Sequence, residues 1–242
     1  MSNNDMSIID HLEELRWRIL KSLGAIFFMS IITFNFANYL VDLLIAPANQ
    51  ISGEMNLQVL TIQGMFMLKW NLAIIGGIIF SIPILTVQIW KFLSPGLYDK
   101  EKKILLPLIL TAFACFMLGG MFAYKVILPF SLDFFASMIT GGIENNFSIN
   151  YYFNFVIALI VGSGVIFELP VASFLFSSIG IINPKFLRQY RREAIMGTVI
   201  LSAIITPPDP ISLIIMSIPM IILYEISIFV SWFANKLFNQ DL

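Results

Sequence analysis

Glu168 is the residue whose chemistry most needs an explanation, because it lies well inside a long apolar segment of the chain. A charged carboxylate at the centre of a bilayer costs about 2.5–3.5 kcal/mol on insertion scales, so such residues usually face a cavity, a partner or another polar group. We therefore interpret Glu168 as a functional polar site. The alternative is a protonated side chain bonded to the carbonyl that Pro170 leaves without a donor.

Other acidic side chains lie at the ends of apolar runs. Glu13 and Glu14 belong to an N-terminal segment in which apolar residues repeat along one side, which predicts a short amphipathic helix on the membrane surface. Glu101 begins the charged entry to a later apolar run, and Glu225 lies near the end of the last one. Each has a simpler interpretation: a solvated charge cluster for the first pair, a weak surface ion pair with Lys100 for Glu101, and an interfacial position for Glu225.

The remaining reactive residue types do not form a catalytic group. The single histidine, His11, precedes the first apolar run, and Ser163 stands between two glycines with no base nearby in the sequence. The single cysteine, Cys115, lies in an apolar run and is interpreted as a small packed side chain. The sequence therefore predicts neither an enzyme nor a cofactor or metal site, and a net charge of -1 gives no argument for nucleic acid.

The elements that must position these residues are membrane spans. Hydrophobic residues make up 58% of the 242 positions and charged residues 12%, against roughly 45–50% and 25% in a soluble domain. A run of roughly 20 apolar residues crosses the hydrocarbon core. The sequence predicts an all-α integral membrane protein forming a single domain, 1–242, with an amphipathic segment at 1–19, a bundle at 20–233 and a tail at 234–242. The six predicted spans are Leu20 to Leu40, Trp70 to Trp90, Leu105 to Phe130, Tyr152 to Gly180, Ala194 to Ile205, and Ile211 to Phe233.

The distribution of basic residues predicts the orientation of these spans. Twelve of the 14 Lys and Arg residues fall in the N-terminal segment, in the second and fourth connections and after the last span. The other two, Lys69 and Lys125, adjoin spans on the opposite side. Short cytoplasmic loops are enriched in Lys and Arg, so both termini are predicted to be cytoplasmic.

The fifth predicted span is unusually short. Its 12 residues would reach about 18 Å as a helix, which is less than the thickness of an unperturbed bilayer. A proline-rich turn follows it at 206–210, so the local bilayer must thin or protein must shield the segment. Prolines in or beside the other spans predict kinked helices at Pro83, Pro107, Pro170 and Pro219.

Four short motifs, in order along the chain, resemble those of the TatC family. They are His11-Leu12-Glu13-Glu14-Leu15-Arg16, the Phe92, Pro95, Leu97-Tyr98 and Glu101 group, Phe167-Glu168-Leu169-Pro170, and Thr206-Pro207-Pro208-Asp209. The resemblance extends over essentially the whole chain. It implies a concave, glove-like bundle of six helices, the last two short, that receives folded cargo proteins whose signal peptides carry consecutive arginines.

The resemblance also implies roles for particular residues. Glu14 and Glu101 would bind the two arginines, and two carboxylates do suit two guanidinium groups, each of which can take a bidentate partner. The signal-peptide site would further include Phe92, Arg16 and Leu12.

The same resemblance implies partners. Glu168 would be an intramembrane site for the small single-span proteins TatA and TatB, and self-association is expected in the bilayer. Structural or partner-contacting roles would fall on Pro47, Pro95, Tyr98 and Asp209. The location would be the bacterial cytoplasmic (inner) membrane or its organellar equivalent.

A second function stays open from the residues. Glu168 could serve as the ion or proton site of a secondary transporter or channel. Such folds often contain paired repeats with matching broken helices, and the two halves of this chain show no convincing repeat.

Overall fold

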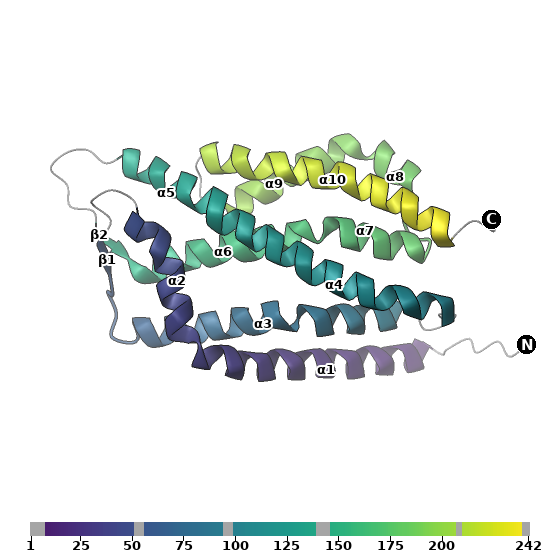
Figure 1. The fold of residues 1–242 in the computed structure, drawn as a ribbon, viewed down its shortest axis with the longest axis horizontal. Helices are drawn as coiled ribbons and strands as arrows, with labels where there is room; N and C mark the ends of the chain where they lie inside the picture. Colours follow the sequence, from purple (N-terminus) through teal and green to yellow (C-terminus); the bar gives the residue numbers. More distant parts are fainter. Residues whose placement is uncertain (1–7, 51–55, 94–98, 139–145, 207–209, 239–242) are drawn as a thin grey trace, which may run out of the picture. The chain divides into compact units, whose positions relative to one another are not determined.

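The structure, a computed structural model, describes residues 8–50, 56–93, 99–138, 146–206 and 210–238. Its secondary structure is almost entirely helical, which confirms the predicted all-α class (Figure 1). The helices are α1 (Ile8–Asn35), α2 (Ala37–Gln50), α3 (Gly64–Leu93), α4 (Asp99–Phe122), the π-helical η1 (Ala123–Ile127), α5 (Leu128–Ser137), α6 (Ile149–Phe167), α7 (Leu169–Ser178), α8 (Pro184–Gln189), α9 (Arg191–Ile205) and α10 (Pro210–Phe238).

Five helical stretches among the described residues are long and apolar enough to cross a membrane. They are His11–Asn35, Gly64–Phe92, Leu106–Ser137, Ile149–Ser178 and Pro210–Leu237. The fifth predicted span corresponds to α9, whose 15 residues reach about 22 Å and therefore fall short of the hydrocarbon thickness. Its shortness is as expected from the sequence, and a sixth crossing stays a prediction.

The chain divides into two compact units. The first unit comprises residues 1–37 and 69–113, and the second comprises 38–68 and 114–242. In the first unit, α1 runs antiparallel to α3, with Thr33 beside Gly76 and Ser30 beside Gly77. A Cβ atom added at Gly77 would lie 2.7 Å from the backbone nitrogen of Ser30, so glycine is what allows the two backbones to approach this closely.

The N-terminal segment is not a separate helix. The described part of the predicted amphipathic segment, 8–19, forms the first turns of α1, which continues without a break into the apolar region. The helix then ends at Asn35 rather than at Leu40, because a turn at Phe36, whose N–H bonds the Thr33 carbonyl at 2.9 Å, separates α1 from α2. The first span is thus shifted toward the N-terminus relative to the prediction.

The second unit is organised around α10, which packs most extensively against α7. Small residues make this close contact possible, because Ser231 and Ala234 are fully buried and Ser177 donates a hydrogen bond to Ser231 Oγ at 2.6 Å. Ser131 of α5 bonds Ser212 of α10 in the same way. Serine pairs of this kind join helices where apolar side chains gain nothing by leaving lipid.

Two strands also belong to this unit. β1 (Asn56–Gln58) pairs in parallel with β2 (Asn146–Ser148), with Asn56 opposite Asn146 and Gln58 opposite Ser148 (Figure 1). The Gln58 side chain donates to Asn146 Oδ1 at 2.9 Å. The pairing ties the segment before α3 to the segment that starts α6.

Two helix irregularities lie next to prolines. The π-helical turn η1 ends two residues before Pro129. The helices α6 and α7 are separated by a single non-helical residue, Glu168, two positions before Pro170. The predicted kink at Pro170 therefore coincides with an observed break. The other three prolines for which kinks were predicted lie inside α3, α4 and α10, which continue through them.

Pro47 is buried within α2 and leaves a helix carbonyl without its usual donor. A proline has no N–H, so the carbonyl of Leu43, four residues earlier, loses its helical partner. The hydroxyl of Tyr124 donates to this carbonyl at 2.7 Å, and Tyr152 donates to the neighbouring Leu44 carbonyl at 2.7 Å. Two tyrosines from η1 and α6 thereby fix α2, which occupies part of the connection that follows the first span.

We expect Gly77→Ala to destabilise the first unit, because its methyl group would meet the backbone of α1. Overpacking of this kind costs about 1–3 kcal/mol. The control is Gly24→Ala on α1, where an added Cβ meets nothing within 4 Å. Unfolding of the detergent-solubilised protein, followed by circular dichroism, measures both. Equal stability of the two variants would contradict the close packing of α1 on α3.

Tyr124→Phe should cost about 1 kcal/mol of unfolding free energy, because it leaves the Leu43 carbonyl without a donor. The same change should cost less in a Pro47→Ala background, since an alanine at that position supplies the missing backbone N–H. A double-mutant cycle on unfolding measures this coupling. Identical costs in the two backgrounds would show that Tyr124 does not compensate for Pro47.

Candidate functional site

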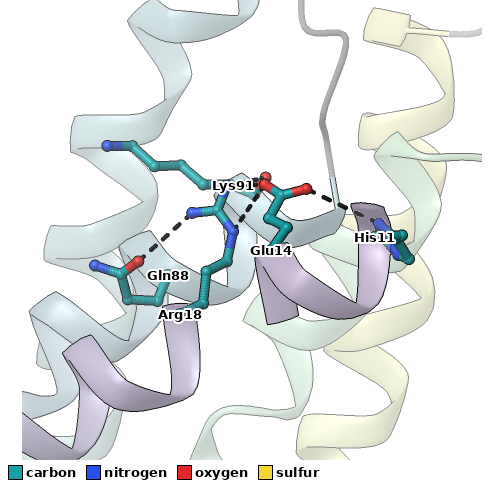
Figure 2. Close-up of polar contacts among 5 residues, drawn as sticks. All are labelled: His11, Glu14, Arg18, Gln88 and Lys91. Atoms are coloured by element: carbon teal, nitrogen blue, oxygen red, sulfur yellow. Dashed lines mark hydrogen bonds and ion pairs between the residues drawn. The ribbon is translucent and has the colours of Figure 1, made fainter. Parts of the chain in front are cut away.

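Glu14 lies on α1 with its side chain turned toward the end of α3 (Figure 2). The carboxylate is mostly buried, with 22% of the side chain exposed, and Arg18 one turn later is 18% exposed. Its position four residues after Glu14 puts the two side chains on the same face of the helix. Arg18 donates to Glu14 Oε1 through Nε at 3.0 Å and also through one of its terminal nitrogens.

The Arg18 guanidinium also bonds two groups of α3. One terminal nitrogen donates to the Lys91 carbonyl at 3.0 Å, and the other makes a long 3.5 Å contact with Gln88 Oε1. Figure 2 shows the guanidinium between these acceptors and Glu14. The close approach of α1 and α3 at their glycine contact makes this bridge possible, and the result is a carboxylate that is fixed on one side.

The other side of the Glu14 carboxylate faces aromatic rings. His11 Nδ1 lies 3.9 Å from Glu14 Oε2, which is beyond hydrogen-bonding distance. The His11 ring stacks on Phe92, with ring centroids 4.5 Å apart and planes 16° apart. Among the residues that the structure describes, Glu14 Oε2 is buried and makes no hydrogen bond. The cluster of His11, Glu14, Arg18, Gln88, Lys91 and Phe92 is called the Glu14 cluster below.

The structure brings only part of the sequence-predicted site together. Glu14 and Phe92 both belong to the Glu14 cluster, whereas Leu12 and Arg16 are exposed and point from the opposite side of α1, about 200° around the helix from Glu14. The backbone of Glu101 is in α4, but its side chain, like Pro95 and Tyr98, lies outside the described residues.

Sequence reasoning missed four members of the Glu14 cluster, one of which, Lys91, takes part only through its backbone carbonyl. Arg18 could have been found, because Glu and Arg four residues apart commonly pair on a helix. His11, three residues before Glu14, has a similar signal. Gln88 carries no local signal, since its part depends on α3 packing against α1.

Glu168 occupies the break between α6 and α7. Its N–H bonds the Val165 carbonyl at 3.1 Å, and its carbonyl accepts from Ala172 at 2.8 Å, so the backbone is satisfied. The side chain is half-buried, and within the described part of the chain Oε1 is buried without a hydrogen bond. Glu168 thus places an oxygen without a hydrogen bond inside the apolar stretch Ile149–Ser178, and its role as a functional polar site stays a prediction. Asp209, which the sequence also singled out, lies outside the described residues.

Glu225 has a different environment. Its Oε2 bonds Arg191 at 2.7 Å, and both side chains are about half exposed, at 49% and 47%. An exposed ion pair of this kind agrees with the interfacial interpretation of Glu225 and gives no reason to assign it a site.

Comparison with known proteins identifies the family. The family model described as "Sec-independent protein translocase protein (TatC)" matches residues 10–219. The chain is 35% identical over 235 residues to the protein of that name from Aquifex aeolicus, a match that covers 96% of this chain and 97% of the relative. It is 36% identical over 244 residues to the one from Carboxydothermus hydrogenoformans, covering 97% and 96%.

Solved structures give the same result. Two crystal structures of the "Twin Arginine Translocase Receptor- TatC", one of them in DDM, align with TM-scores of 0.80 and 0.81 and sequence identities of 34% and 33%. The alignments cover 93% and 91% of this chain and 99% of each solved chain. The helical membrane fold, the four motifs and these matches agree. The chain is a multi-pass membrane protein that belongs to the TatC family of Sec-independent protein translocase components.

Proposed function

We propose that this chain is the receptor subunit that binds twin-arginine signal peptides and organises the export complex for folded proteins. The observation that carries the proposal is the Glu14 cluster, where a carboxylate with one buried, unbonded oxygen lies beside a stacked aromatic pair. The names of the two related structures, each a twin-arginine translocase receptor, support it.

The chemistry of the Glu14 cluster suits a guanidinium group. A guanidinium donates planar hydrogen bonds to a carboxylate edge and stacks its face on aromatic rings, whereas a lysine ammonium can do neither in the same way. In this proposal Glu14 takes one arginine of the signal peptide, Glu101 takes the other, and Phe92 contacts the adjoining apolar residues. The exposed Leu12 and Arg16 would contact other parts of the peptide.

Glu168 has a separate proposed role. An unpaired carboxyl group within a span is costly, and a polar residue of a neighbouring span can satisfy it. We assign Glu168 to binding of the single-span partners TatA and TatB, and Asp209, Pro95 and Tyr98 to structural or partner contacts. The transporter alternative loses support, because the relatives are named as protein translocase components.

The setting of this receptor follows from the same proposal. The chain would act as one six-span domain in a bacterial cytoplasmic membrane, with both termini cytoplasmic, as the distribution of basic residues indicates. Copies would associate with one another and with the single-span partners, and translocation would need no catalytic residue of this chain.

Glu14→Gln should weaken binding of a twin-arginine peptide about tenfold, since it removes a charge-assisted hydrogen bond worth about 1.5–3 kcal/mol. The matched control is Glu13→Gln, which removes the same charge from the exposed neighbouring position. Fluorescence anisotropy of a labelled peptide on the purified protein measures both, and a peptide with both arginines replaced by lysine tests specificity.

The expected pattern has three parts: wild type and Glu13→Gln bind the arginine peptide equally, Glu14→Gln binds it weakly, and the lysine peptide binds weakly throughout. If wild-type protein bound the lysine peptide as tightly as the arginine peptide, the proposed receptor function would be wrong.

Glu168→Gln should impair co-purification with the single-span partners and leave twin-arginine peptide affinity within about twofold of wild type. The reason is that the change removes the carboxylate in the α6–α7 break without touching the Glu14 cluster. Pull-down of the tagged chain from membranes measures assembly, and anisotropy measures peptide binding. Parallel loss of both properties would refute the separation of the two sites.

A further inference from the structure

The Glu14 carboxylate already has an arginine partner within this chain. Arg18 places two of its N–H groups on Glu14 Oε1. A fork in which each nitrogen takes a different oxygen would occupy the whole carboxylate edge. Here both Arg18 nitrogens donate to Oε1, so Oε2 receives no hydrogen bond from Arg18. Any ligand arginine that binds Glu14 must therefore either displace Arg18 or use Oε2.

The anchoring of Arg18 argues against displacement. Besides Glu14, its guanidinium holds the backbone carbonyl of Lys91 at 3.0 Å and reaches Gln88 Oε1 at 3.5 Å. Removing Arg18 from the Glu14 cluster would leave the mostly buried Glu14 carboxylate without its donor and would also break the contacts with Gln88 and Lys91. A ligand would have to compensate for all of these lost contacts before it gained anything.

The unbonded oxygen Oε2 is the remaining place for a ligand guanidinium on Glu14. Because Oε2 is buried, a ligand reaches it only when a neighbouring side chain moves, and one candidate is His11, whose side chain is 45% exposed. Oε2 faces His11, whose ring stacks on Phe92, and the 3.9 Å separation of His11 Nδ1 from Oε2 leaves this oxygen unbonded among the described residues (Figure 2). A guanidinium arriving at Oε2 would meet aromatic rings beside the carboxylate, which is a favourable surrounding for its face.

We propose that Arg18 is a positioning residue that locks the Glu14 carboxylate to α3 through Oε1 and so presents Oε2 to the ligand guanidinium. The inference rests on the proposed signal-peptide function and extends it to specificity. Arg18 also cancels most of the charge of Glu14, so the Glu14 cluster gains little from general attraction of cations. Discrimination between an arginine peptide and a lysine peptide then depends on the fixed orientation of the Glu14 carboxylate, because the planar guanidinium needs a carboxylate oxygen in a particular direction.

The test compares the affinities of the arginine and lysine peptides for full-length variants in detergent. Arg18→Gln should weaken the arginine peptide about tenfold and bring the ratio of the two affinities close to one, because the carboxylate is no longer held in one orientation. Arg18→Lys, which keeps the charge but loses the fork, should restore only part of the ratio. The matched control is Lys21→Gln, which removes a positive charge from an exposed position of α1 and should leave both affinities unchanged.

A double-mutant cycle separates positioning from a general structural effect. If Arg18 acts through Glu14, the Glu14→Gln/Arg18→Gln pair should bind no more weakly than Glu14→Gln alone. Gln88→Leu, which removes one anchor without touching the ion pair, should shift the arginine-to-lysine ratio in the same direction by a smaller factor. If Arg18→Gln does not fold, the affinity ratio measured for Gln88→Leu tests the inference in its place.

Three results would overturn the inference. Tighter binding of the arginine peptide by Arg18→Gln would make Arg18 a competitor rather than a positioning residue. An unchanged affinity ratio in Arg18→Gln, or in Gln88→Leu if that is the variant that folds, would remove its role in specificity. If the loss of peptide affinity from Arg18→Gln simply added to the loss from Glu14→Gln, Arg18 would act independently of Glu14. Failure of wild type to prefer the arginine peptide would instead refute the proposed function itself.

Discussion

Within a bilayer, every backbone carbonyl that loses its helical donor must find another partner inside the protein, because lipid supplies none. This constraint explains several contacts that would be optional in water. The π-helical turn η1 lies shortly before Pro129, and Tyr124 of that turn donates to the Leu43 carbonyl that Pro47 leaves open in the connection after the first span. The break at Glu168 likewise keeps its backbone N–H and carbonyl bonded. The prolines can thus interrupt the spans without leaving these groups unpaired.

The same constraint shapes the Glu14 cluster. A half-buried carboxylate and guanidinium are tolerable only when paired and further hydrogen-bonded, and Arg18 meets this need with one acceptor on its own helix and two on α3. The pairing requires α3 to lie beside α1, and the backbone contact between Gly77 and Ser30 is one place where the two helices approach closely. A packing contact about three turns away therefore helps to keep the two helices together, and a rigid support of this kind is what selective recognition requires.

Much of the architecture could be predicted from the sequence, because apolar runs in a membrane protein are long and bounded by charges. The five long spans lie near their predicted ranges, and the shortness of α9 was visible from its flanking arginines and prolines. The turn at Phe36 was missed because neither glycine nor proline marks it. Glu14 and Phe92 were named through family motifs, whereas Gln88 joins them only through contact between helices distant in sequence.

The two glutamates that stand out among the described residues each have one buried oxygen without a hydrogen bond, but Glu14 is paired with Arg18 through its other oxygen, which argues for different uses. Glu14 is paired with Arg18 and held in one orientation, which is what the proposed selection of a ligand by geometry requires. Glu168 has a buried oxygen without a hydrogen bond in the part of its unit that the structure describes. Inside a span this leaves a polar group unsatisfied, and a polar side chain from another helix would relieve the cost. A carboxyl group that is most stable when a neighbour is present is suited to assembly, while one already held in place is suited to recognition.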